Sequence, residues 1–101
     1  MKWIDLVKEN PENILDIPME FRSKEICEEA FKRDIMVLPF IPIQYITLDL
    51  CLEAVKENGM VLEFIPEIYK SCEVCIEAVK EDKNAIQFVP YEIKILIKDL
   101  Y

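Results

Sequence analysis

The chain has 101 residues, 52% of them apolar, which is enough material for one hydrophobic core and too little for two independent ones. We therefore expect a single domain over residues 1–101. Its 12 basic and 20 acidic residues give a net charge of −8 at pH 7. This acid excess argues against direct nucleic-acid binding, which needs clustered Lys and Arg, and favours a basic or neutral protein partner. Histidine is absent, so the commonest general base and metal ligand is missing.

The first residues show no targeting pattern. Asp5 and Lys8 interrupt the apolar run that a secretory signal needs, so we expect a cytoplasmic protein. The longest charge-free run lies between Asp34 and Asp49, is too short for a membrane helix and contains Pro39, so we expect no membrane contact. In such a chain the four cysteines are expected to be reduced thiols.

The sequence repeats itself every 24 residues. Four repeats begin near Trp3, Cys27, Cys51 and Cys75, and a stub over residues 95–101 follows. A fixed period of this length indicates a stacked architecture, in which each repeat buries its apolar face against its neighbours. The recurring positions are cysteines 27, 51 and 75, alanines 30, 54 and 78, and prolines 18, 42, 66 and 90.

Each repeat contains a pattern typical of a helix start. Ser23, Thr47 and Ser71 stand four residues before a recurring cysteine, where a hydroxyl oxygen can accept from a first-turn amide. Apolar residues then follow at helical spacing. In the third repeat Gly59 stands where a helix C-terminal glycine would. The helices are expected to end at Asn10, Asp34, Asn58 and Asp82.

A second, shorter helix is expected in each repeat, limited by the recurring proline. In the third repeat it carries Leu62 and the pair Phe64 and Ile65, and Tyr69 indicates a one-turn link to the next repeat. Short apolar runs such as residues 35–38 could also form strands, but the Asn ladder and Leu-x-Leu pattern of a leucine-rich solenoid are missing. We predict an all-α fold of stacked helical hairpins, a short α-solenoid with four repeats and a C-terminal capping helix.

The capping helix would come from the degenerate stub. Its inner face is expected to carry Ile93, Leu96, Ile97, Leu100 and Tyr101. A terminal repeat must shield the last core layer, so a cap that is too short would favour an end-to-end homodimer.

Three strings carry a resemblance to a known family. Cys51-Leu-Glu-Ala-Val-Lys-Glu-Asn-Gly59, Leu62-Glu-Phe-Ile-Pro66 and Cys75-Ile-Glu-Ala-Val-Lys80 resemble the repeat of the DUF4116 family, a domain of unknown function built from tandem copies of a C-L-E-A-V-K-x-N-G, A-L-x-Y-V-P unit. The resemblance is strong in the third and fourth repeats, weaker in the second and faint in the first. It implies a helical tandem-repeat domain and carries over no catalytic residues.

The cysteines offer one candidate for chemistry. Cys72 and Cys75 form a C-x-x-C pair just after a helix cap, a place where a thiol pKa can be lowered, so a thiol redox protein is an alternative function. However, the 24-residue period explains Cys75 as a packing residue. Cys27, Cys51 and Cys75 would lie about 10 Å apart in a stacked array, too far for one tetrahedral metal site or a disulfide, and we predict no metal and no cofactor.

The second repeat departs from the others at three positions. It has Pro39, Ile43 and Ile46 where its counterparts are mostly polar or charged. Because a position that is charged in three of four copies should face water, we expect these three residues to form an exposed partner-binding or self-association surface. Packing of the second repeat against the turn around Trp3 is the other interpretation. The counterparts are Glu63 and Gln87 for Pro39, Glu67 and Tyr91 for Ile43, and Arg22, Lys70 and Lys94 for Ile46.

No pattern in the sequence assembles a reactive site, since Glu and Lys three residues apart, as in Glu53 and Lys56, fit a solvated helix face. We therefore predict a non-enzymatic helical-repeat module that binds a protein partner. The alternatives are the thiol redox protein and an acidic decoy that inhibits a nucleic-acid-binding partner.

Overall fold

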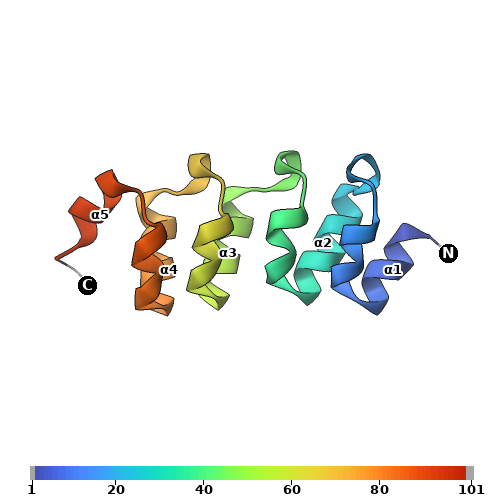
Figure 1. Cartoon of the computed structure of the whole chain (residues 1–101), viewed down its shortest axis with the longest axis horizontal. Helices are drawn as coiled ribbons and strands as arrows, with labels where there is room; N and C mark the ends of the chain where they lie inside the picture. Colours follow the sequence, from blue (N-terminus) through green and yellow to red (C-terminus); the bar gives the residue numbers. More distant parts are fainter. Residues whose placement is uncertain (1, 100–101) are drawn as a thin grey trace. The chain divides into compact units, whose positions relative to one another are not determined.

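The computed structural model describes residues 2–99. Over this range the chain forms helices and no strand, so the predicted all-α fold is confirmed and the strand alternative is wrong (Figure 1). Its contacts divide the chain into two compact units, Met1–Ile46 and Thr47–Tyr101, here called unit 1 and unit 2. The single domain expected from the sequence stays a prediction.

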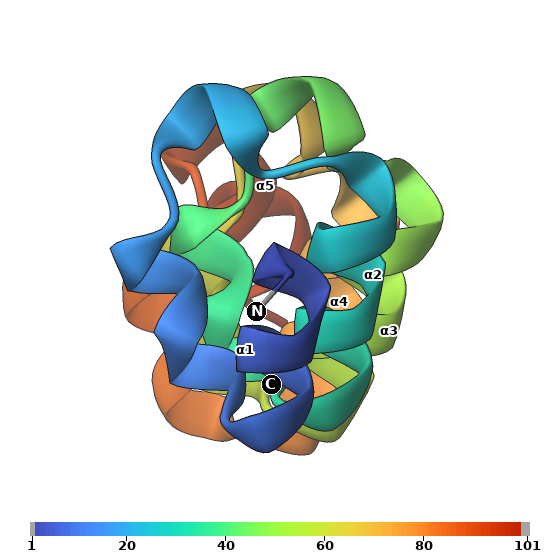
Figure 2. The same ribbon diagram turned by 90° about the vertical axis from the view of Figure 1, so that its right-hand side faces the viewer.

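Unit 1 packs two α-helices with short 3-10 helices around an apolar core. α1 lies beside α2, and η1 contacts α1, α2 and η3 (Figure 2). Val7, Ile14 and Leu38 are fully buried between these elements. The elements are α1 (Trp3–Glu9), η1 (Pro11–Asp16), η2 (Met19–Phe21), α2 (Lys24–Arg33), η3 (Ile35–Phe40) and η4 (Ile43–Tyr45).

Unit 2 has a similar element order. α3 packs on α4, η5 contacts both helices as well as η7, and α5 contacts α4. Its core includes Cys51, Val55, Leu62, Val74 and Cys75, all fully buried. The elements are α3 (Leu48–Glu57), η5 (Gly59–Phe64), η6 (Glu67–Tyr69), α4 (Cys72–Glu81), η7 (Lys83–Phe88) and α5 (Tyr91–Ile97).

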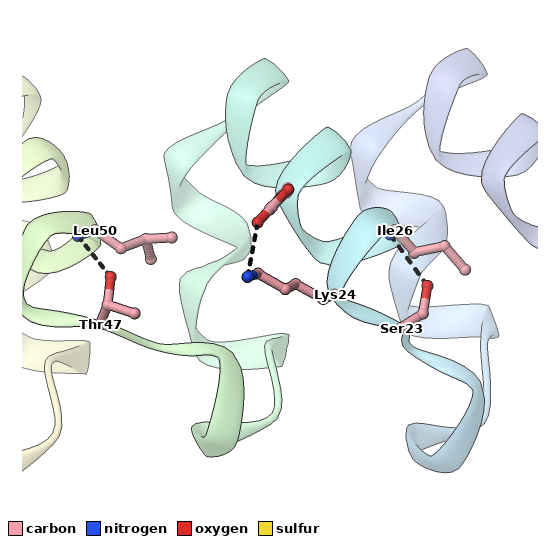
Figure 3. A network of polar contacts seen from close by, with 6 residues as sticks. Ser23, Lys24, Ile26, Thr47 and Leu50 are labelled. Atoms are coloured by element: carbon pink, nitrogen blue, oxygen red, sulfur yellow. Dashed lines mark hydrogen bonds and ion pairs between the residues drawn. The ribbon is translucent and has the colours of Figure 1, made fainter.

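The predicted helix starts are confirmed by their capping bonds. The amide of Ile26 donates to Ser23 Oγ (3.3 Å), and the amide of Leu50 donates to Thr47 Oγ1 (3.2 Å) (Figure 3). Ser71 caps α4 in the same way. Each bond satisfies a first-turn amide that has no partner within its helix. The three capped helices, α2, α3 and α4, each have 10 residues.

The Asx residues end one helix and start the next. The amide of Asp34 donates to the carbonyl of Ala30 (2.9 Å) at the end of α2, and the Asp34 carboxylate accepts from the amide of Met36 (2.9 Å) at the start of η3. Asn10, Asn58 and Asp82 make the same pair of bonds. One residue thus ends the α-helix through its amide and starts the next helix through its side chain. The short helices that follow are 3-10 helices.

Gly59 has a different role from the predicted one. It is the first residue of η5, and its φ angle is not positive, so it is not a left-handed helix cap. A Cβ atom at Gly59 would collide with the carbonyl oxygen of Ala78 and would lie only 3.2 Å from the amide nitrogen of Asp82. Glycine is needed here because η5 passes directly against the end of α4.

The C-terminal helix begins earlier than the stub predicts. α5 starts at Tyr91, directly after Pro90, and continues to Ile97 without a break at Ile95. The fourth repeat has no Ser or Thr at this position, so no side-chain oxygen can cap a new helix. The one-turn link and the cap are therefore merged into one helix.

The inner face of this helix is only partly as predicted. Ile97 is buried and Ile93 is half-buried, as expected. Leu96 is exposed, so its predicted place on the inner face is wrong. Leu100 and Tyr101 lie outside the described residues.

Candidate interaction surface

Ile46 is not a surface residue. Its exposed fraction is 6%, so the prediction that it lies on the surface with Pro39 and Ile43 is wrong. The reason is visible at Lys70, 24 residues further on, whose side chain is only 10% exposed although its ammonium group pairs with Glu67. A lysine at this position buries its aliphatic stem and brings its charge to the surface, and Ile46 occupies the place of the stem.

Ile43, in contrast, is 63% exposed, and Pro39 is also exposed. The two units differ here in a pair of residues that lie three positions apart in the chain. In unit 2, Glu67 and Lys70 form an ion pair with 3.1 Å between Oε1 and Nζ. In unit 1 the corresponding pair is Ile43 and Ile46. The replacement removes both charges and leaves one isoleucine in the core and one on the surface.

Met19 extends this apolar surface within unit 1, and it lies 24 residues before Ile43. Its Sδ atom lies 3.7 Å from Nη1 of Arg22, and the same nitrogen donates to the carbonyl of Phe40 (2.7 Å). This shared contact places the exposed Met19 side chain near the carbonyl of Phe40, at the end of η3. We call Met19, Pro39 and Ile43 the Ile43 surface.

Arg22 is the residue that fixes this arrangement. Besides its bond to Phe40, its Nε donates to the carbonyl of Ile17 (2.8 Å). The guanidinium therefore joins the end of η1 to the end of η3, a role that suits a planar side chain with several donors. The roles of Arg22 and Met19 are not predicted from the sequence. The apolar residues at both positions 19 and 43 were the signal that could have indicated Met19.

The Trp3 ring stacks on Phe21, with ring centroids 6.4 Å apart and an interplanar angle of 21°. Trp3 therefore finds an aromatic partner within the first repeat. Since Ile43 remains mostly exposed, the alternative that the turn around Trp3 covers it is not supported.

The structure favours a packing role for the recurring cysteines. Cys27, Cys51 and Cys75 are buried, and this burial raises the pKa of each thiol to about 11. Such thiols are protonated at neutral pH and are poor nucleophiles. Cys72 is exposed, but its C-x-x-C partner Cys75 is fully buried.

Glu29 forms ion pairs with basic residues of the same helix, α2. It lies 3.3 Å from both Lys32 and Arg33, and the hydrogen bond from Lys32 contributes most to lowering the pKa of its carboxyl group. Lys80 and Glu77 form a similar pair at 3.6 Å. These are ion pairs within one helix at a surface, which contribute little to stability.

These observations define the chain as an all-α protein of short capped helices, with thiols in its core and an apolar surface on unit 1. Residues 47–94 match the family model described as "Domain of unknown function (DUF4116)". This match confirms the resemblance inferred from the strings of the third and fourth repeats. Neither a curated protein nor a solved structure matches the chain. Across residues 2–99, no helix is both long and apolar enough to cross a membrane.

Proposed function

We propose that this protein is a non-enzymatic helical-repeat module that binds a protein partner. Its repeats form a short α-solenoid with a 24-residue period, four helical hairpins and a terminal capping helix. Unit 1 provides the binding site through the Ile43 surface.

The exposure of Ile43 carries this proposal. Isolated exposed apolar residues are common, but here Ile43 follows Phe40 closely in the chain, and the carbonyl of Phe40 accepts from the same Arg22 guanidinium that contacts the exposed Met19. Of the two corresponding positions in unit 2, one carries the charged Glu67 and the other Tyr91.

The partner is a protein segment with apolar side chains and basic flanking residues. The apolar side chains would cover Ile43 and Met19. The exposed Asp16 and Glu20 stand beside Met19 in the sequence, and the chain carries a net charge of −8. This charge opposes the close approach of a second copy and attracts a basic partner.

The proposal is tested with two synthetic peptides of equal positive charge. One is an amphipathic helix of Leu and Lys, and the other has Ser in place of every Leu. Fluorescence anisotropy is expected to show binding of the Leu peptide at least tenfold tighter. The double variant Met19→Gln, Ile43→Gln should remove that preference, whereas Ile68→Gln, at an exposed isoleucine of unit 2, should keep it.

Equal affinity for the two peptides would contradict the proposal and favour the acidic decoy, because binding would then depend on charge alone. An equal loss in the Ile43 and Ile68 variants would also contradict it. Sedimentation of the free protein over a range of concentrations serves as a further check, since self-association lost in the double variant would identify a second copy as the occupant.

A further inference from the structure

Unit 2 contains a pocket of about 390 Å³ between α4, η7 and α5. Val79 of α4 and Ile86 of η7 provide apolar lining, and three lysines line the remainder. The lysines are Lys83, Lys94 and Lys98.

The pocket combines an apolar interior with positive charge. Val79 is buried and Ile86 is half-buried, so they form apolar walls. Lys94 is half-buried as well, whereas Lys83 and Lys98 are exposed and can bring their ammonium groups to the rim. Among the described residues, no acidic side chain lines this pocket. The nearby Asp82 carboxylate accepts from the amide of Asn84 (2.9 Å).

This concentration of charge is unusual for the chain. Three of its 12 basic residues line one small pocket, although acidic residues outnumber basic ones 20 to 12. Ammonium groups at the rim of such a pocket are suited to hold an anion whose apolar part enters it.

We propose that this pocket binds a small amphiphilic anion, with a carboxylate at the lysines and an apolar chain against Val79 and Ile86. The volume lies within the range of about 300–1,000 Å³ that is typical of small-molecule sites. The proposal does not depend on the Ile43 surface, which belongs to unit 1. It assigns unit 2 a ligand of its own.

The test uses decanoate as the probe, with decanol and inorganic phosphate as partial mimics. Isothermal titration calorimetry on the full chain should show decanoate binding at least tenfold tighter than decanol, which lacks the charge, and than phosphate, which lacks the apolar chain. The double variant Lys83→Met, Lys94→Met keeps the apolar stems and should weaken decanoate binding about tenfold or more.

The matched control is Lys56→Met, Lys80→Met, which removes the same charge from exposed positions outside the pocket and should bind decanoate like the unchanged protein. Circular dichroism establishes that each variant is folded. Absence of decanoate binding at millimolar concentration would overturn the proposal, as would equal binding of decanol. Equal losses in the two double variants would also overturn it.

Discussion

Gly59 lies directly against the carbonyl group of Ala78, with no room for a side chain between them. The amide of Gly59 also donates to the carboxylate of Glu81 (2.6 Å), one helical turn further along α4. The start of η5 is thus held on the end of α4 by one close contact and one charge-assisted hydrogen bond. This relationship explains why the chain has its one glycine at this position.

Replacing this glycine should therefore destabilise the protein. In Gly59→Ala the new methyl group must displace the backbone of α4, and overpacking of this kind costs about 1–3 kcal/mol in the free energy of unfolding. Urea denaturation followed by circular dichroism measures this loss. Lys83→Ala, at the corresponding first residue of η7, is the control and should change stability by less than about 0.5 kcal/mol. Equal stability of the two variants would show that η5 and α4 are less closely packed.

Arg22 is expected to stabilise unit 1 through its two carbonyl contacts. Arg22→Met keeps the apolar stem but leaves the carbonyls of Ile17 and Phe40 without this donor, which should cost about 1–3 kcal/mol. Lys24→Met removes an exposed lysine whose ammonium lies 4.0 Å from Glu28, and it should cost almost nothing. Thermal unfolding of both variants checks the difference. A loss of the same size in Lys24→Met would mean that the loss of any positive charge destabilises the protein, and that the two hydrogen bonds of Arg22 are not the cause.

Thiol labelling should distinguish Cys72 from the other cysteines. In the folded protein at pH 8, an aromatic disulfide reagent should react with one thiol quickly, because only Cys72 is exposed. In urea all four thiols should react. The variant Cys72→Ser should show no fast phase. Any fast-reacting thiol in this variant would indicate that a cysteine of the core is accessible, and would revive the redox alternative.

The protein should lose stability at alkaline pH. The buried Cys27, Cys51 and Cys75 have thiol pKa values of about 11 in the folded state, against an ordinary value of 9.0. The unfolded chain therefore releases these protons first, so the contribution is complete below pH 9 and is lost as the pH rises from 9 to 11. Urea midpoints at pH 8, 9.5 and 10.5 measure the loss. The triple alanine variant should show a smaller dependence on pH, and an unchanged dependence would show that these thiols are not its cause.

The helix boundaries could be predicted because they depend on local chemistry. Ser23 and Thr47 cap the amides of residues three positions later, and Asp34 ends α2, as their sequence positions indicate. Such bonds involve neighbours in the chain, so a pattern of residue types is sufficient to predict them.

The errors arose where contacts between distant residues decide the outcome. The prediction that Ile46 lies on the surface rests on its charged counterparts, but Lys70 shows that a charged residue can be largely buried at this position. The prediction that Gly59 is a helix cap is wrong because its role depends on a close contact with Ala78, 19 positions further along the chain. A pattern of residue types does not contain the side-chain direction or the distance between helices that decide these cases.

The proposed interaction surface is tested most directly by locating where the amphipathic Leu and Lys peptide binds. Backbone amide shifts in a proton–nitrogen correlation spectrum report this residue by residue. The largest shifts are expected within residues 19–22 and 39–46, and they should disappear in Met19→Gln, Ile43→Gln. Shifts centred on residues 67–70, or spread evenly over the acidic residues of both units, would contradict the claim that unit 1 binds a partner through Ile43.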